Sequence, residues 1–108
     1  MTHILKKMEQ LIEDNIDNIR ELCNTYSVKN LYVFGSAASE NMNKDSDIDF
    51  LISFQNMPAE QYSDNYFSMH YALEDFFGRK IDLLTENSLS NPYFIQSIEK
   101  TKKLLYAA

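Results

Sequence analysis

The sequence contains few of the residues that form disulfides and glycine-rich ligand-binding loops. Its 108 residues contain one cysteine, two glycines, two prolines and no tryptophan. Since the lone cysteine, Cys23, cannot form a disulfide within the chain, a reducing cytoplasm is the expected setting. The two glycines, Gly35 and Gly78, are too few for a P-loop or a dinucleotide-binding fingerprint, and both motifs are excluded.

Long apolar runs are also absent. The uncharged segment 50–54 is far shorter than the roughly 20 residues that span a bilayer. The first seven residues lack the basic-then-apolar order of a signal peptide. We therefore expect no membrane segment. The composition, 44% hydrophobic and 24% charged, is that of a globular protein, and the length predicts a single domain over 1–108.

Positive charge is scarce. Sixteen acidic residues outnumber ten basic ones, which gives a net charge of −6. A protein that binds nucleic acid must neutralise phosphates with lysine and arginine, and here the only dense basic group lies at 100–103. The charge balance therefore disfavours direct binding of DNA or RNA.

Hydrophobic periodicity divides the chain into helices and strands. Apolar residues every three or four positions predict one amphipathic helix over 4–23, and the same spacing predicts helices over 58–77 and 91–100. Gly78 occupies the place of a helix carboxyl cap. Short β-rich runs predict strands at 31–34, 48–54, 79–85 and 104–106. This order predicts an α/β (α+β) domain in which a small mixed sheet is flanked by helices.

Acidic residues gather on two of the predicted strands. Asp47 and Asp49 are two apart on a strand, so both side chains project from one surface while Ile48 faces the core. Asp82 stands in another strand between apolar residues, where aspartate is unfavourable. If these strands are neighbours, three carboxylates converge. Such a cluster can hold the two metal ions that act in in-line phosphoryl displacement, and Mg²⁺ prefers these oxygen ligands.

A glycine-serine pair before the acidic residues has the composition of an anion-binding turn. Gly35 ends a strand and permits close approach of a ligand to the backbone. Ser36 follows it and opens the short segment 37–39, whose composition suits one helical turn with free N–H groups facing an anion. Carboxylates beside an anion cradle suggest a bound nucleoside triphosphate with Mg²⁺.

Gly35-Ser36, a ten-residue spacer, Asp47-x-Asp49 and the later Asp82 together resemble the DNA polymerase β-like nucleotidyltransferase superfamily. The size of the chain and its core, Ser46 to Phe50, resemble the minimal nucleotidyltransferases, or MNT proteins, in particular. The resemblance implies the nucleotidyltransferase fold over nearly the whole chain.

The resemblance also implies a function. Asp47 and Asp49 match aspartates that bind two Mg²⁺ ions, and Asp82 matches one that completes the site and helps to activate the attacking hydroxyl. Gly35 and Ser36 match the turn that holds the triphosphate of ATP or another nucleoside triphosphate. MNT proteins commonly act as antitoxins paired with a HEPN-type toxin, and some transfer AMP to a tyrosine on it. We therefore expect transfer of a nucleoside monophosphate, most plausibly AMP, to a partner protein.

Two positions depart from the family pattern. Many relatives have an arginine after the serine and a glycine four positions after it, where this chain has Ala37 and Glu40. The loss of a cation and the gain of an acid weaken phosphate binding, and Lys44, Arg79 or Lys80 are candidates to replace the charge. The alternative is therefore an inactive module of the same fold that neutralises a partner by binding.

Two other known patterns contain acidic residues at these positions. The segment 45–47 has the composition of a polar turn. Acids at alternate positions suggest a calcium-binding EF-hand loop, but that loop requires glycine where Phe50 stands and glutamate where Asn56 stands. Neither histidine has the cysteine or histidine neighbours of a zinc site.

Overall fold

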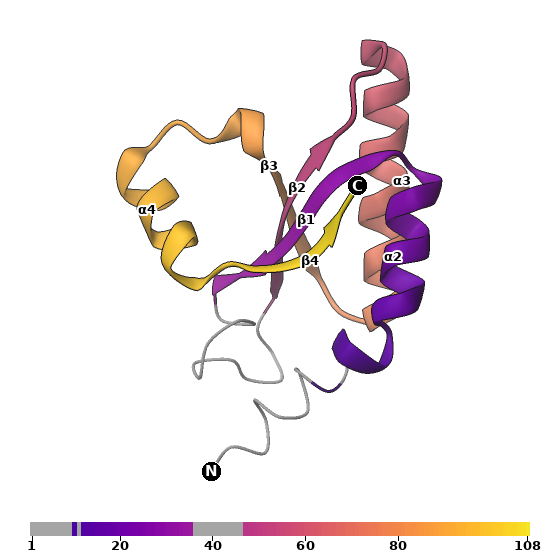
Figure 1. Cartoon of the computed structure of the whole chain (residues 1–108), viewed down its shortest axis with the longest axis horizontal. Coiled ribbons are helices and arrows are strands. Elements are labelled where there is room, and N and C mark those ends of the chain that lie inside the picture. Colours follow the sequence, from indigo (N-terminus) through magenta and orange to yellow (C-terminus); the bar gives the residue numbers. More distant parts are fainter. Residues whose placement is uncertain (1–9, 11, 36–46) are drawn as a thin grey trace.

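The computed structural model describes residues 10, 12–35 and 47–108, which form a four-stranded sheet with helices on both faces (Figure 1). The strands are β1 (Val28–Phe34), β2 (Ile48–Phe54), β3 (Ile81–Thr85) and β4 (Lys103–Ala107). The helices are α2 (Ile16–Thr25), α3 (Ala59–Phe77), α4 (Pro92–Thr101) and the single 3-10 turn η2 (Glu86–Ser88). None of the helices in this part of the chain has the length and apolar composition that a membrane crossing requires.

The sheet is mixed, as the sequence predicts. Its strand order is β3-β2-β1-β4. β1 pairs antiparallel with both β2 and β4, whereas β2 and β3 are parallel. Parallel neighbours need a long crossover connection, and α3 provides it between β2 and β3. This parallel pair decides where the acidic residues meet.

The larger hydrophobic core lies between the sheet and the helices α2 and α3, on the right of Figure 1. Phe50 of β2, Ile19 of α2 and Leu73 of α3 are fully buried in it. Burial of one such side chain stabilises the fold by about 1.5–3 kcal/mol. A smaller core on the opposite face joins Leu51 of β2 to Ile98 of α4.

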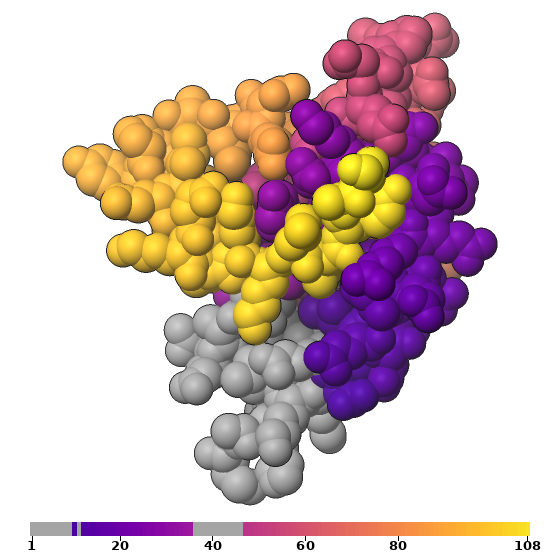
Figure 2. Space-filling model, in the orientation of Figure 1, coloured from indigo at the N-terminus to yellow at the C-terminus, as the bar shows by residue number. Residues whose placement is uncertain are grey.

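The two cores set the directions of the β2 side chains. Because successive strand residues point to opposite faces, Phe50 enters the α2–α3 core and Leu51 enters the α4 core. The strand is thus buried on both faces, which explains its nearly continuous apolar sequence. In the space-filling view, β4 lies across the visible face between α4 and α2 (Figure 2).

Most of the predicted elements are confirmed, with one correction. β2 has the predicted bounds, 48–54, and Gly78 caps α3 in the left-handed conformation. The single helix predicted over 4–23 is wrong within the described residues, because a turn at Asn15 separates helical residues 12–14 from α2. The N–H of Asn15 bonds to the carbonyl three residues back, on Ile12, at 3.2 Å. Asn15 has φ −111° and ψ 9°, outside the helical range, and α2 begins after it.

Gly78 offers a test of the α3 terminus. It has φ 62° and ψ 31°, its N–H donates to the Glu74 carbonyl at 2.9 Å, and an added Cβ would meet nothing within 4 Å. Gly78→Ala is therefore expected to destabilise the protein through backbone strain alone, by about 1–2 kcal/mol. Gly78→Asn should cost less, because asparagine tolerates this conformation better. Urea denaturation of both variants tests this; equal losses would contradict the backbone explanation.

Candidate active site

Two carboxylates meet across the parallel strands β2 and β3. Asp49 of β2 and Asp82 of β3 are register partners. Their strand neighbours Phe50 and Leu83 are buried against α2 and α3, so both aspartates project from the opposite face of the sheet, which carries α4. The structure therefore brings two of the three sequence-predicted carboxylates side by side.

Burial and neighbouring carboxylates raise the pKa of Asp49. Its carboxyl has a pKa of about 6, above the ordinary 3.8. The largest cause is partial burial, followed by the negative charge of Asp82, a side-chain hydrogen bond with Asp82 and the charge of Asp47. The described structure thus concentrates negative charge at this point, and a positive charge placed there would relieve the repulsion.

Gly35 lies directly against the Asp49 carboxyl. Phe34, the last residue of β1, is the register partner of Asp49, and Gly35 follows it with φ +68°. A Cβ added at Gly35 would lie 2.6 Å from Oδ2 of Asp49, closer than such atoms approach. Glycine is therefore required here twice, for its left-handed backbone and for the space that the carboxyl occupies.

The carboxyl end of α4 is hydrogen-bonded to Gly35. The N–H of Gly35 donates to Oγ1 of Thr101, the last residue of α4, at 3.1 Å. The Thr101 hydroxyl donates in turn to the Ser97 carbonyl at 3.5 Å. Phe94 of α4 also packs edge-on against Phe34, with ring centroids 6.3 Å apart. Helix α4 therefore fixes the end of β1 beside the carboxylates.

Sequence reasoning missed Thr101. The residue has no motif around it, and its partner Gly35 lies 66 positions away in the sequence. The only available signal was a hydroxyl residue at the end of a predicted helix, which many helices contain.

Asp47 lies at the edge of this group. Its Oδ2 is 3.7 Å from Nζ of Lys80, and its charge contributes to the raised pKa of Asp49. Among the described residues, no three acidic, histidine or cysteine side chains stand ready to hold a metal ion. The donors nevertheless suit a hard cation, since Asp49 and Asp82 offer adjacent carboxylate oxygens, and Asp47 can join them if it leaves Lys80.

Several predicted residues lie outside the described residues. Ser36, the second residue of the predicted phosphate turn, is one of them. The departures Ala37 and Glu40 and the candidate cation Lys44 are others. Of the candidate cations, Lys80 lies beside the acidic group, where its Nζ is 3.7 Å from Oδ2 of Asp47.

Comparison with known proteins identifies the family. Residues 16–105 match the model of the nucleotidyltransferase domain family. A protein of Methanocaldococcus jannaschii with the provisional name protein adenylyltransferase MJ1379 is 33% identical over 97 residues, which cover 90% of this chain and 86% of the relative. The protein adenylyltransferase MntA of Thermococcus cleftensis is 28% identical, over 81% of this chain and 82% of its own.

Solved structures show the same fold. A toxin-antitoxin structure with AMP-PNP superposes with a TM-score of 0.68 at 20% identity, over 87% of this chain and 74% of the matched chain. A structure of the tri-AMPylated Shewanella oneidensis HEPN toxin in complex with MNT antitoxin gives a TM-score of 0.62 at 18% identity, over 89% and 72%. The sheet and helices described above are thus a nucleotidyltransferase fold, and the class of enzyme is nucleotidyltransferase. The chain belongs to the nucleotidyltransferase domain family.

The raised pKa of Asp49 makes a prediction about stability and pH. Because folding raises this pKa from 3.8 to about 6, folding favours the protonated carboxyl. The contribution of Asp49 to stability is therefore full below about pH 4 and is lost as the pH rises to about 6. Asp49→Asn keeps a neutral side chain, so its stability relative to the wild type should rise across this window and then level off. Urea denaturation at pH 4, 5, 6 and 7 measures the difference.

The matched control is Asp64→Asn, which removes an exposed carboxylate from α3. It should show no gain between pH 4 and pH 6 of the kind expected for Asp49→Asn. If the stability of Asp49→Asn relative to the wild type is the same at every pH, folding does not raise the pKa of Asp49.

The Gly35–Thr101 hydrogen bond predicts a second effect. Thr101→Val keeps the shape of the side chain but removes the acceptor of the Gly35 N–H, and the unsatisfied group should cost about 1–3 kcal/mol. Thr101→Ser keeps the hydroxyl and should lose much less. Denaturation measures the stability, and amide hydrogen exchange at Gly35 reports the bond itself. Unchanged exchange in Thr101→Val would contradict this role.

Proposed function

We propose that the chain is a Mg²⁺-dependent protein adenylyltransferase, which moves AMP from ATP to a hydroxyl on a partner protein. The observation that carries the proposal is the meeting of Asp49 and Asp82 on one face of the sheet, directly beside Gly35. Paired carboxylates next to a glycine turn suit a triphosphate with its cations, because the cations offset both the carboxylate repulsion and the phosphate charge.

Each residue has a role in this proposal. Gly35 and Ser36 bind the phosphates of ATP through the turn that follows β1. Asp82 receives the proton of the attacking hydroxyl. The hydroxyl oxygen forms a bond to the α-phosphorus, the bond between that phosphorus and the oxygen bridging to the β-phosphate breaks, and pyrophosphate leaves. Thr101 positions the turn through the Gly35 N–H.

Asp47, Asp49 and Asp82 would hold two Mg²⁺ ions. When bound, these ions supply positive charge to the attacking and leaving oxygens. A pKa of about 6 leaves the Asp49 carboxyl mostly ionised at neutral pH, as a ligand must be. The Lys80 ammonium lies 3.7 Å from the Asp47 carboxylate and compensates its charge.

The partner in this proposal is a HEPN-type toxin, and the chain is its antitoxin. The support comes from the relatives: two are named as protein adenylyltransferases, and a structural neighbour is a complex of an AMPylated HEPN toxin with MNT antitoxin. ATP as the donor is supported by the AMP-PNP in another neighbour. A cytoplasmic location agrees with the free, buried Cys23.

The second candidate is a binding module of the same fold that neutralises its partner without transferring AMP. The observation in its favour is the Asp47–Lys80 contact, which occupies one of the three carboxylates. Ala37 and Glu40, in place of the usual arginine and glycine, favour it as well. Both candidate functions predict a stable complex with the toxin. Only the enzyme predicts that the toxin becomes modified with AMP.

Transfer of label separates the two candidates. The purified protein is incubated with ATP labelled at the α-phosphate, Mg²⁺ and a HEPN-type protein encoded beside it. The enzyme should label the partner, and chelation of Mg²⁺ should stop the reaction. Asp49→Asn and Asp82→Asn should each reduce labelling by roughly 100-fold or more, the scale seen when one electrostatic group is lost from an active site.

The exposed Asp64→Asn is the matched control and should label the partner at the wild-type rate. A tight complex that gains no label establishes the binding module instead. Release of pyrophosphate with a diffusible acceptor, and with no protein partner, would contradict both.

A further inference from the structure

A groove of about 340 Å³ lies between the helices α2 and α3, which stand side by side on one face of the sheet (Figure 1). On each helix the lining residues are three or four positions apart, so each helix turns one side toward the groove. The lining includes Glu21, Leu22 and Thr25 of α2 and Ala72, Asp75 and Phe76 of α3. Both helices cover the face of the sheet opposite to Asp49 and Asp82, so the groove is separate from the candidate active site.

The apolar part of the lining is connected to the hydrophobic core. Leu22 is half-buried and packs against the α2–α3 core. The ring of Phe76 lies beside that of Phe77, with centroids 5.6 Å apart, and Phe77 packs in turn against the buried Phe50 at 6.0 Å. A row of rings therefore supports the groove wall from the inside.

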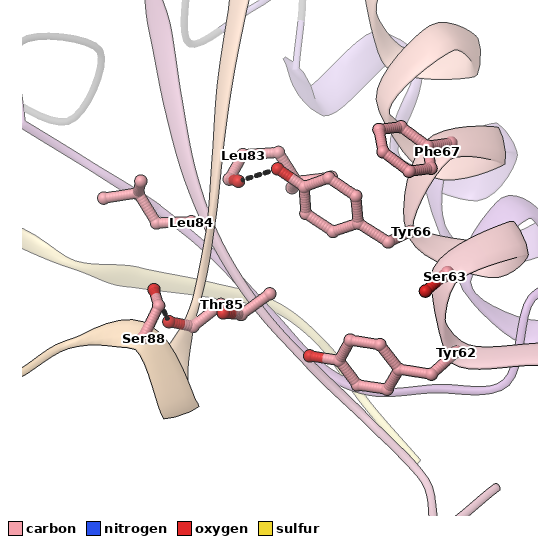
Figure 3. Close-up of a pocket in the computed structure, with 8 residues that line it drawn as sticks. All are labelled: Tyr62, Ser63, Tyr66, Phe67, Leu83, Leu84, Thr85 and Ser88. Carbon is pink, nitrogen blue, oxygen red and sulfur yellow. Dashed lines mark hydrogen bonds between the residues drawn. The ribbon is translucent and has the colours of Figure 1, made fainter. Parts of the chain in front are cut away.

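The other side of α3 is hydrogen-bonded to the edge strand β3. The Tyr66 hydroxyl donates to the Leu83 carbonyl at 2.6 Å, as the dashed line in Figure 3 marks. His70 bonds through Nε2 with the Ile81 carbonyl at 3.0 Å. These bonds fix α3 on the sheet, so the groove has its shape before a ligand arrives, which lowers the entropic cost of binding.

Two carboxylates at the groove have no counter-ion. Glu21 and Asp75 are exposed, and neither takes part in an ion pair within the part of the chain that the structure describes. Helix α3 contains no lysine or arginine. Arg20, the one cation of α2, donates its Nε to the Leu105 carbonyl at 3.2 Å and does not line the groove. The groove therefore favours a positively charged ligand.

The mixture of apolar and acidic groups distinguishes between cations. A metal ion requires a shell of oxygen ligands, which Leu22, Ala72 and Phe76 do not supply. Arginine has an apolar stem that can lie on these side chains, and its planar guanidinium stacks on aromatic rings and donates to carboxylates in pairs. The ammonium of lysine is a strongly hydrated point charge and stacks less well. The lining thus suits arginine best.

Exposed aromatic rings continue this surface along α3. Phe67 is 53% exposed and Tyr71 is 65% exposed. Together with Asp75 they follow at intervals of four residues, on one side of the helix. Exposed aromatic side chains are enriched at protein–protein interfaces. A free amino acid in the groove would leave these rings uncovered, whereas a protein would cover them.

We propose that the groove between α2 and α3 binds an arginine side chain of a partner protein. The guanidinium stacks on Phe76 and donates to Glu21 and Asp75, and the neighbouring surface of the partner covers Tyr71. The inference goes beyond the proposed function, because docking on this face requires neither ATP nor the carboxylates of the candidate active site.

Peptide binding tests the groove. An alanine-based helical peptide with three arginines, spaced four residues apart, is titrated into the ¹⁵N-labelled protein. It should shift the backbone amide signals of Leu22, Ala72 and Phe76 in a saturable manner. The same peptide with citrulline, a neutral isostere of arginine, should leave them unchanged, and the lysine peptide should bind at least about fivefold more weakly. Equal binding of either comparison peptide, or no shifts at these positions, would overturn the inference.

Charge variants locate the binding site. Glu21→Gln with Asp75→Asn should raise the Kd of the arginine peptide at least about tenfold, equivalent to about 1.4 kcal/mol. The matched control, Glu60→Gln with Asp64→Asn, removes the same two residue types from exposed positions of α3 outside the groove. It should change the Kd by less than about twofold. Equal effects of the two pairs would show that net charge alone attracts the peptide, and the inference would be wrong.

The role of the ring is tested by selectivity. Phe76→Leu keeps an apolar wall and should abolish the preference for the arginine peptide over the lysine peptide. A loss of folded protein changes both Kd values by the same factor, so their ratio remains valid if the variant is less stable. An unchanged preference would contradict the stacking of the guanidinium on Phe76.

Two further measurements separate the other sites and sources. Asp49→Asn should leave the Kd of the arginine peptide unchanged, and a large increase would place the peptide at the Asp49–Asp82 pair instead. N-acetyl-L-argininamide should bind at least about tenfold more weakly than the peptide, because it covers none of the exposed rings. Equal affinity would assign the groove to free arginine and overturn its role in docking a protein.

Discussion

The approach of Asp49 to Asp82 is the interaction on which the site depends. Two carboxylates on neighbouring strands repel, and this repulsion adds to the larger effect of partial burial in raising the pKa of Asp49. The parallel pairing of β2 and β3 enforces the approach, because it sets the two residues in register. Burial of the strands' other residues in the α2–α3 core stabilises this arrangement. Hydrophobic burial thus keeps together two groups that would separate in water.

The fold could be predicted well from the sequence because its elements have strong local signals. The β-rich run at 48–54 and the helical spacing after Pro58 predicted β2 and α3, and the left-handed cap at Gly78 is a purely local effect. The break at Asn15 was missed, since the apolar stripe continues through it and the change lies in a single backbone hydrogen bond. Strand order could be supplied only by the family resemblance, because pairing joins residues far apart in the sequence.

The site was predictable in its residue types and less so in its geometry. Aspartate between apolar strand residues is costly, so Asp49 and Asp82 stand out in the sequence itself. Their contact depends on which strands are neighbours, a property of the whole sheet. The Asp47–Lys80 pair and the Thr101 hydroxyl depend on tertiary packing and leave no pattern in the sequence. The sequence thus identifies the candidate chemical groups of the site, and tertiary packing determines which of them lie close enough to act together.

Gly35 has a consequence for how this protein changes over generations. Any missense change in its codon introduces a Cβ where the Asp49 oxygen already lies, on a backbone that L side chains rarely adopt. Every other amino acid at this position would place its Cβ in the space that the Asp49 carboxyl occupies. We expect position 35 to remain glycine in homologues, even where the partner protein differs.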